Sequence, residues 1–519
     1  VVVVHNGIVE NYIELKEELL AEGIQFKSDT DSEIIVHLVE RYYASGENLV
    51  EAARKAFSHL KGHHGIVITS SKEPDKIVAT RIGNAGGVVI GFGEGEMFLA
   101  SDMPAILEHT RDVYFLESQQ IAVVRQDGLE VQDMKGKSIE YDIDNVPWDP
   151  VAAEKGEYKH FMQKEIHEQV RSLTETIAGR VDFEDGRVIL PHLNLTEKSA
   201  QEIEKIIIIA CGTAAYAAMV GKILIEKIAR IPVEVDIASE FRYRDPIINK
   251  KTIVMAISQS GETADTLAAM AEGKKRGATL WSIINVIGSQ AMRISDGYIS
   301  MQTGPEIGVA STKAYTAPLV DQFMLAILLA DLRGMIDKKT RKALVAELRK
   351  LPDLAGQVLS REEDYKQIAK SIKDITHCLY LGRGINMPTA YEGALKLKEI
   401  SYIHAEGYPA GEMKHGPIAL FDEDMPVILI APKDPWYEKM ISQIEQTKSR
   451  GAPAIVMATD GDKLIPTMSD QIIWVPEVHW MLSPAILVIP LQLLAYHIAA
   501  MRGLDVDQPR NLAKSVTVE

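Results

Sequence analysis

From about residue 200 onward, short apolar runs alternate with helical patterns, and this alternation limits the fold more than any other feature. Parallel strands need long crossover connections, so strands that alternate with helices predict a parallel sheet with helices on both faces. We therefore expect a doubly wound α/β sheet, closed by a long helical stretch over Tyr315–Leu351. The expected strands are Lys205–Ala210, Pro232–Asp236, Thr252–Ile257, Thr279–Asn285 and Gly297–Met301.

The same pattern returns further along the chain. Internal repetition of this kind predicts two similar α/β subdomains in tandem, over residues 200–345 and 365–505. The corresponding segments are Ile206–Gly212 and His377–Gly382, Ala238–Phe241 and Ala405–Tyr408, Thr252–Ile257 and Met425–Ala431, and Gly277–Ile284 and Gly451–Ala458.

Residues 1–145 differ, because their short apolar runs are separated by turns and only Val9–Glu22 and Asp31–Tyr43 have helical periodicity. This pattern predicts a sheet-rich α+β domain. Asp142–Tyr158, with its prolines, predicts a linker, and a helical segment over Lys159–Ala178 follows it. The expected parts are a domain over 1–145, a linker and helix over 146–200, subdomains over 200–345 and 365–505, and a tail over 506–519.

The balance of charge narrows the possible partners. The 519 residues include 56 basic and 73 acidic side chains, a formal net charge of −17, which argues against non-specific binding to nucleic acid or anionic membranes. Cys211 and Cys378 are too few for a disulfide framework, and no apolar run reaches the ~18 residues of a membrane span. We expect a cytoplasmic protein that holds any anionic substrate by local donors.

One loop has the composition of an anion site. Ser258–Thr263, with the sequence SQSGET, follows the apolar run Thr252–Ile257 and precedes the helical pattern Ala264–Arg276. The free N–H groups and positive dipole end of a helix N-terminus bind phosphate, although serine and threonine are also ordinary helix caps. Ligands of such sheets bind beyond the carboxyl ends of strands, where this loop lies together with Cys211–Thr213 and Gly382–Gly384.

Three residues of the helical pattern Tyr391–His404 share one face, because Glu392, Lys396 and Glu399 lie at i, i+4 and i+7. The spacing alone favours a solvated stripe of ion pairs, but a partly buried carboxylate there could transfer protons. His415 lies in an expected turn, where imidazole suits proton transfer near neutral pH, although a lone loop histidine is usually a surface residue. The sequence contains neither a metal-ligand pattern nor a nucleotide or flavin motif, so we expect no metal and no cofactor.

Several longer segments make the chain resemble the glutamine:fructose-6-phosphate amidotransferase family, in its bacterial type. The resemblance implies an N-terminal-nucleophile glutaminase domain followed by two tandem sugar-isomerase (SIS) subdomains. It also implies conversion of fructose 6-phosphate and glutamine to glucosamine 6-phosphate and glutamate, the first step of amino-sugar (UDP-N-acetylglucosamine) synthesis. The matching segments are Ile237–Tyr243, Ile307–Ala314, Glu392–Glu406, Gly411–Pro417 and Asp505–Glu519.

The resemblance also implies roles for individual residues. Glu399 would move a proton from C1 to C2, Lys396 would balance charge, and His415 would open the sugar ring in the partner subunit of an obligate homodimer. Lys514, in a tail that folds over the sugar, would form a Schiff base at C2. The implied sugar-phosphate contacts are Gly212, Thr213, Ser258, Gln259, Ser260, Thr263, Val309 and Ser311, and the implied glutamine site is Asn6, Gly7 and Asp31.

Two departures from the family pattern bear on activity. The family's glutaminase nucleophile is an N-terminal cysteine, whereas this sequence opens on Val1 in what reads as the middle of a strand. We expect a fragment without its N-terminal segment, in which only the isomerase half works, with ammonia as nitrogen donor. Ala214 stands where the bacterial motif more often has a hydroxyl residue. The alternatives are a non-catalytic sugar-phosphate-binding regulator and an aldose–ketose phosphate isomerase.

Overall fold

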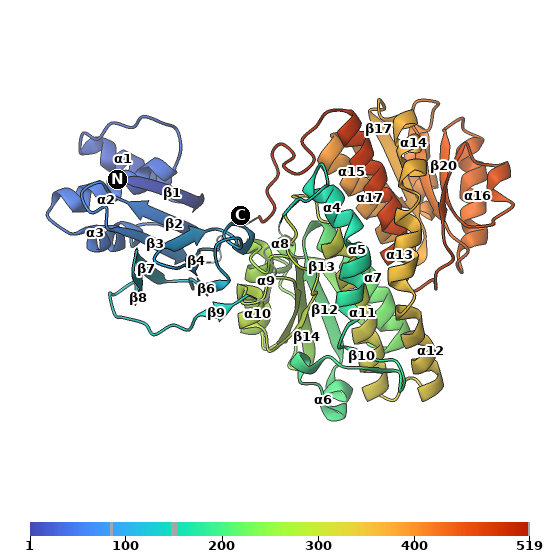
Figure 1. Cartoon of the computed structure of the whole chain (residues 1–519), viewed down its shortest axis with the longest axis horizontal. Coiled ribbons are helices and arrows are strands. Elements are labelled where there is room, and N and C mark those ends of the chain that lie inside the picture. Colours follow the sequence, from blue (N-terminus) through green and yellow to red (C-terminus); the bar gives the residue numbers. More distant parts are fainter. Residues whose placement is uncertain (84–86, 147–153, 517–519) are drawn as a thin grey trace.

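The computed structural model describes residues 1–83, 87–146 and 154–516 of the chain. Its N-terminal domain, blue in Figure 1, is built on two antiparallel sheets. The five-stranded sheet has the order β1 (Val2–Gly7), β2 (His64–Thr69), β3 (Lys76–Ile82), β7 (Gln120–Arg125) and β8 (Gly128–Asp133). The four-stranded sheet has the order β5 (Met97–Ala100), β4 (Val89–Phe92), β6 (Asp112–Phe115) and β9 (Asp144–Asn145).

The prediction of a sheet-rich first domain is confirmed. The two expected helices are α1 (Tyr12–Ala21) and α2 (Ser32–Ala44), and a third, α3 (Leu49–Phe57), packs with them on the five-stranded sheet. Helix α3 begins after Asn48, whose side chain accepts the N–H of Glu51 at 3.0 Å. Pro147, Trp148 and Pro150 of the expected linker lie outside the described residues.

The segment after the linker forms two helices instead of one. Helix α4 (Phe161–His167) ends where α5 (Gln169–Ile177) begins, with Glu168 between them. Short elements then lead to the first subdomain: β10 (Val181–Asp182), β11 (Arg187–Val188) and α6 (Glu197–Glu202).

Both subdomains are five-stranded sheets in which neighbouring strands run parallel. The two orders are equivalent, so the prediction of two tandem doubly wound subdomains is confirmed. The first order is β13 (Val233–Ile237), β12 (Lys205–Ala210), β14 (Thr252–Ser258), β15 (Thr279–Ile284) and β16 (Gly297–Ser300). The second is β18 (His404–Pro409), β17 (His377–Gly382), β19 (Val427–Ala431), β20 (Ala454–Thr459) and β21 (Gln471–Val475).

Helices cover both sheets (Figure 1). The strand order reverses between β12 and β14, and between β17 and β19, and such a reversal opens a crevice at the carboxyl ends of the strands. The helices of the first subdomain are α7 (Gly212–Ile228), α8 (Ala238–Phe241), α9 (Ala264–Lys275), α10 (Gln290–Ile294) and α11 (Lys313–Leu332). Those that follow are α12 (Lys338–Leu348), α13 (Leu351–Leu359), α14 (Glu362–Ile372), α15 (Met387–Ser401), α16 (Tyr437–Lys448) and α17 (Ser483–Met501).

Two expectations about these elements are wrong. The single long helix over Tyr315–Leu351 is broken after α11, where Gly334 has a φ of +66°, a value that ends a helix readily only at glycine. The equivalence of Ala238–Phe241 with Ala405–Tyr408 also fails, because the first segment is α8 and the second lies in strand β18. The true counterpart of β18 is β13, the edge strand at the same position in the first sheet.

The expected helix over Tyr391–His404 ends earlier, because Tyr402 has a φ of +60° and His404 begins β18.

Among the residues that the structure describes, two helices, α11 and α17, are long and apolar enough to cross a membrane by length and composition alone. This corrects the expectation that the chain has no such segment. In the structure these helices form part of one core shared by both subdomains, and their apolar windows are 83% and 89% buried. Burial inside the protein accounts for their apolar sequences.

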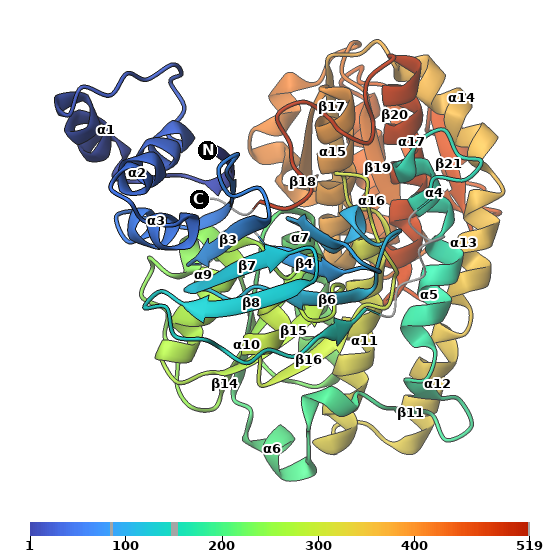
Figure 2. The ribbon, with the colours of Figure 1, turned by 60° about the vertical axis from the view of Figure 1, so that its left-hand side comes forward.

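The N-terminal domain packs against the first subdomain, beside α10 (Figure 2). Val286, from the loop before α10, shares an apolar core with Val89 and Phe115 of the four-stranded sheet. The ring of Phe115 lies where a Cβ on Gly288 would have to be, so only glycine allows this approach.

Candidate active site

A cavity of about 290 Å³ opens at the carboxyl ends of β12 and β14, where the strand order of the first sheet reverses. The start of α7 and the loop after β14 form two of its walls, α15 of the second subdomain forms another, and the C-terminal tail crosses it. Segments far apart in the sequence thus meet in one place. The expected site residues that line the cavity are Gly212, Thr213, Ser258, Gln259, Ser260, Thr263, Val309, Ser311, Lys396, Glu399 and Lys514.

The loop between β14 and α9 is tied together by its own hydroxyl groups. The N–H of Gly261 donates to Ser258 Oγ at 3.0 Å, and the N–H of Glu262 donates to Ser260 Oγ at 3.1 Å. Thr263 occupies the N-cap position of α9, yet its hydroxyl oxygen lies 3.4 Å from that of Ser258. In an ordinary cap the hydroxyl accepts helix amides, so this geometry favours the interpretation as an anion site.

Two contacts fix the loop from outside. Gly261 has a φ of +65°, and a Cβ there would overlap Ser289 Oγ, so the loop requires glycine at this position. The N–H of Ala264, the first residue of α9, donates to Val516 O at 3.1 Å. The tail therefore reaches the start of the helix that the loop precedes.

Glu392, Lys396 and Glu399 form one connected cluster on α15. Lys396 Nζ lies 3.3 Å from Glu392 Oε1 and 2.6 Å from Glu399 Oε2, and it donates to Thr213 Oγ1 at 3.0 Å. The Thr213 hydroxyl in turn donates to Glu392 Oε1 at 3.2 Å. The Lys396 side chain is 1% exposed and that of Glu392 is fully buried, so the interpretation as a solvated stripe is wrong.

Burial and charge act together on this cluster. Burial raises the pKa of Glu392 to about 7, although Lys396 acts to lower it. Burial also acts to lower the pKa of Lys396, but the carboxylates of Glu392 and Glu399 outweigh it, so that this pKa lies above its ordinary value. Lys396 is therefore a fixed cation, and Glu399, with 22% of its side chain exposed, is a partly accessible carboxylate that lines the cavity.

Lys514 enters the cavity from the tail and meets a buried carboxylate. Its Nζ donates to Glu306 Oε2 at 2.5 Å and to Gly308 O at 2.8 Å. Glu306 Oε1 accepts the N–H groups of Thr312 at 2.9 Å and Ala314 at 3.1 Å. Burial acts to raise the pKa of Glu306, but Lys514 and these hydrogen bonds outweigh it and lower the pKa to about 2.

The tail is anchored before it reaches the cavity. Both carboxylate oxygens of Asp507 accept N–H groups at the start of α4, from Phe161 and Met162, at 2.9 Å each. The guanidinium of Arg510 lies 4.2 Å from the ring centre of Tyr402. These contacts fix where Lys514 enters.

His415 is an expected site residue that lies apart from the others. It ends the 3₁₀ segment Ala410–His415, it is exposed, and it is not among the described residues that line the cavity. Within one chain the cavity therefore holds Lys396, Glu399 and Lys514 without this imidazole.

The expected glutamine residues lie together in the N-terminal domain. Asn6 and Gly7 end strand β1, and Asp31 Oδ2 accepts the N–H of Val9 at 2.7 Å. Gly7 has a φ of +152°, and a Cβ there would overlap the carbonyl oxygen of His63.

Sequence reasoning missed four charged residues at or near the cavity: Glu306, Glu262, Arg81 and Asp102. Glu306 directly precedes the matching segment Ile307–Ala314, which is the signal that could have found it. Burial raises the pKa of Asp102 to about 6, with Glu262 acting in the same direction and Lys514 against it. Arg81 reaches Glu262 from another domain, a relation that no local pattern encodes.

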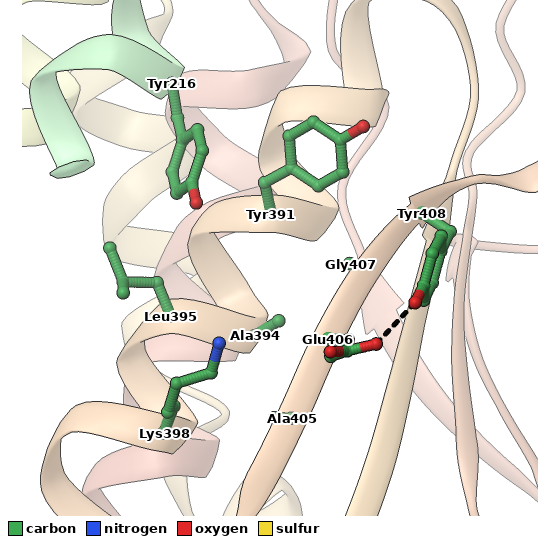
Figure 3. Close-up of a pocket in the computed structure, with 9 residues that line it drawn as sticks. All are labelled: Tyr216, Tyr391, Ala394, Leu395, Lys398, Ala405, Glu406, Gly407 and Tyr408. Carbon is green, nitrogen blue, oxygen red and sulfur yellow. Dashed lines mark hydrogen bonds between the residues drawn. The ribbon is translucent and has the colours of Figure 1, made fainter. Parts of the chain in front are cut away.

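A second cavity of about 340 Å³ lies on the other side of α15 (Figure 3). Tyr216 of α7 and Tyr391 of α15 lie with their ring centres 5.5 Å apart, and Tyr408 donates to Glu406 on β18. The expected site residues are not among the described residues that line it. Helix α15 thus presents Lys396 and Glu399 to one cavity and Tyr391, Leu395 and Lys398 to the other.

The second subdomain fills the crevice that the first keeps open. The loop between β19 and α16 is the counterpart of the loop between β14 and α9. Its Trp436 ring lies against Gly384, where a Cβ would overlap the ring. The Gly382–Gly384 turn, expected to be a further ligand position, is thus covered by an aromatic side chain.

Comparisons with known proteins agree with this arrangement. A family model described as SIS domain matches residues 201–328 and 371–502, and one described as glutamine amidotransferase domain matches residues 1–108. The glutamine–fructose-6-phosphate aminotransferase (isomerizing) of Thermus thermophilus is 48% identical over 519 residues, which are all of this chain and 84% of that protein. The protein of the same name from Thermococcus kodakarensis is 47% identical over 521 residues, with the same coverage.

Solved structures extend the similarity to the fold. The C-terminal domain of glucosamine-fructose-6-phosphate aminotransferase from Francisella tularensis has a TM-score of 0.65 and 39% identity, and it covers 69% of this chain and all of that chain. Glucosamine-6-phosphate deaminase from Thermotoga maritima has a TM-score of 0.54 and 21% identity over the same share, which shows the tandem fold alone.

Proposed function

Because the chain belongs to the glutamine–fructose-6-phosphate aminotransferase (isomerizing) family, we propose that it converts fructose 6-phosphate to glucosamine 6-phosphate, with glutamine or ammonia supplying the nitrogen. This is the first step of amino-sugar synthesis, which is a cytoplasmic process. One observation carries the proposal. A single cavity joins the hydroxyl-rich loop of the first subdomain, the Lys396–Glu399 pair of the second and Lys514 of the tail.

The phosphate is bound by the loop Ser258–Thr263. Ser258, Ser260 and Thr263 have hydroxyls on the cavity, and the loop lies at the amino end of α9, where the helix dipole favours an anion. Thr213, Val309 and Ser311 line the remaining walls and contact the sugar. This local set of donors suits a protein whose net charge of −17 repels the phosphate at long range.

Glu399 moves the proton from C1 to C2. A carboxylate can accept a proton from carbon, and Lys396 Nζ lies 2.6 Å from Glu399 Oε2. The Lys396 charge also stabilises the negative charge that develops on the sugar when the C1 proton leaves.

Lys514 forms a Schiff base at C2. The amine attacks the ketone carbon of the open-chain sugar, and loss of water gives an iminium. Ammonia then adds to C2, and the bond from C2 to the lysine breaks, which releases the lysine amine. The attack requires a neutral amine, and the hydrogen bond to Glu306 Oε2 holds this amine in the cavity. The tail closes the cavity over the sugar and keeps water away from the intermediate.

His415 opens the sugar ring in the active site of a partner subunit, so the working enzyme is a homodimer. Three facts support this: His415 is exposed, it is not among the described residues that line its own chain's cavity, and Glu399 in that cavity has 22% of its side chain exposed. Leu420, in the segment after His415, is also 52% exposed, as expected for a residue that a second copy covers.

The N-terminal domain binds glutamine through Asn6, Gly7 and Asp31. We also propose the division of the chain at 1–145, 146–200, 200–345, 365–505 and 506–519, because each predicted subdomain contains one complete parallel sheet.

The test is product formation from fructose 6-phosphate and ammonium ions. Glucosamine 6-phosphate should appear, and it should disappear in the Glu399→Gln variant while the sugar still binds. Binding without turnover in the unmodified protein would identify a regulator instead. Glucose 6-phosphate as the sole product would identify an aldose–ketose isomerase.

A further inference from the structure

Arg81 connects the N-terminal domain to the phosphate loop of the first subdomain. It extends from β3, its side chain is 1% exposed, and its Nη2 donates to Glu262 Oε2 at 2.9 Å. The same nitrogen donates to the side chain of Gln290, at the start of α10, and Nη1 donates to Leu116 O at 3.4 Å. Arg81 is thus held by groups from both domains.

Glu262 belongs to the loop that we assign to phosphate binding, between Gly261 and Thr263. Its N–H donates to Ser260 Oγ, and its Oε1 accepts the N–H of Gln290 at 2.7 Å. Its side chain is 13% exposed and is not among the described residues that line the cavity. The loop therefore carries a carboxylate on its outer side.

A carboxylate in an anion-binding loop works against its ligand. Two negative charges within one loop repel each other most strongly where water is excluded, and an opposite charge in contact with one of them cancels the repulsion. Asp102, whose side chain feels the charge of Glu262, adds another acid on the same side. Arg81 is the cation in contact with Glu262 on this side.

We propose that Arg81 is a positioning residue for sugar-phosphate binding: it neutralises Glu262, so that the N-terminal domain supplies part of the affinity of the isomerase site for phosphate. The proposal rests on the proposed function of the loop Ser258–Thr263. The contact is preorganised, because Phe115 packs on Gly288 and Arg293 Nη1 donates to Phe115 O at 3.1 Å in the same interface.

The test compares Arg81→Gln, Glu262→Gln and the double variant in the ammonia-dependent reaction. Loss of the arginine alone should raise KM for fructose 6-phosphate about tenfold, with kcat changed less than about twofold, because binding is lost before the chemistry begins. The double variant should regain a KM within about twofold of that of Glu262→Gln, because the repelling carboxylate is gone. Inorganic phosphate, used as a competitive inhibitor, should follow the same order.

Three controls keep the outcomes distinct. Arg81→Lys keeps the charge and should keep KM near that of the unmodified enzyme. Arg125→Gln, which removes an arginine of the same domain that pairs with Glu130 instead, should leave KM unchanged. If the double variant is as impaired as Arg81→Gln, the arginine has only a structural role and the proposal is overturned. If Ser258→Ala and Thr263→Ala leave KM unchanged, the proposed function of the loop fails instead.

Discussion

Lys514 Nζ and Glu306 Oε2 lie 2.5 Å apart, and this ion pair holds a residue of the C-terminal tail against a buried carboxylate of the first subdomain. The pair fixes the position of the amine relative to the first subdomain. A tail residue placed in this way enters the cavity at one defined point.

Glu306→Gln should reduce glucosamine 6-phosphate formation about 10–100-fold, because the amine of Lys514 loses the carboxylate that holds it in the cavity. Borohydride trapping with fructose 6-phosphate, followed by intact mass, measures the Schiff base directly. Lys514→Arg keeps the ion pair but removes the nucleophile, so it should trap nothing. Unchanged trapping in Glu306→Gln would show that the pair has no part in the reaction.

Glu399→Gln should lower kcat at least about 100-fold with little change in sugar binding, because the amide cannot accept the C1 proton. Exchange of the C1 proton with solvent deuterium, followed by NMR, isolates this step. Glu406→Gln, on the far side of α15 in the second cavity, is the matched control and should exchange normally. Normal exchange in Glu399→Gln would assign the proton transfer to another group.

Mixing His415→Asn with Glu399→Gln tests whether His415 acts across a dimer. Each variant alone should be inactive. After subunit exchange, half of the dimers are hybrids, and each hybrid has one intact site, so about a quarter of the unmodified activity should return. A mixture that stays inactive after exchange, verified by native mass spectrometry, would mean that His415 acts within its own chain.

Gly261→Ala should raise KM for fructose 6-phosphate and destabilise the protein by about 1–3 kcal/mol, because the methyl group meets Ser289 at a left-handed φ. Gly277→Ala is the matched control: its φ of +89° is also left-handed, but it lies at the other end of α9 in open space. Thermal unfolding should show a lowered melting temperature in both variants. Only the first should show altered sugar binding.

Asp102→Asn should stabilise the protein more at neutral pH than in acid. Burial raises the pKa of Asp102 from 3.8 to about 6, so the folded state keeps a proton that the unfolded state has lost, and stability falls as pH rises between these values. Asparagine removes this loss of stability, worth up to about 3 kcal/mol at pH 7.5. The difference in melting temperature between variant and parent should be small at pH 4 and largest above pH 7. A constant difference would show that the carboxyl group titrates normally.

Much of the fold follows from local sequence. The strands Lys205–Ala210 and His377–Gly382 agree with the structure at both ends, because uninterrupted apolar runs before a glycine turn leave little freedom. The expectation of one helical stretch over Tyr315–Leu351 is wrong, because Gly334 ends α11 although the helical periodicity of apolar residues continues beyond it. Helix α3 was missed because nine residues give too short a periodic signal.

The candidate site was predictable only in part. Hydroxyl residues after a buried strand and charged residues at i, i+4 and i+7 can be recognised in the sequence alone, so the loop and the α15 cluster were identified. Whether that cluster is buried depends on α7, whose Thr213 bonds to it from 183 residues away. Arg81 and Glu262 are separated by 181 residues and belong to different domains, so only the folded chain brings them together.

The indole ring of Trp436 makes the second repeat differ from the first in its capacity to bind a ligand. Two sheets with the same strand order have two equivalent crevices at the carboxyl ends of their strands. In the second sheet the side chain of Trp436 lies at this position. Each chain should therefore take up one sugar phosphate rather than two in a calorimetric titration, and its binding curve should have a single step. The second repeat then binds no sugar of its own, and its helix α15 places Lys396 and Glu399 in the cavity of the first repeat.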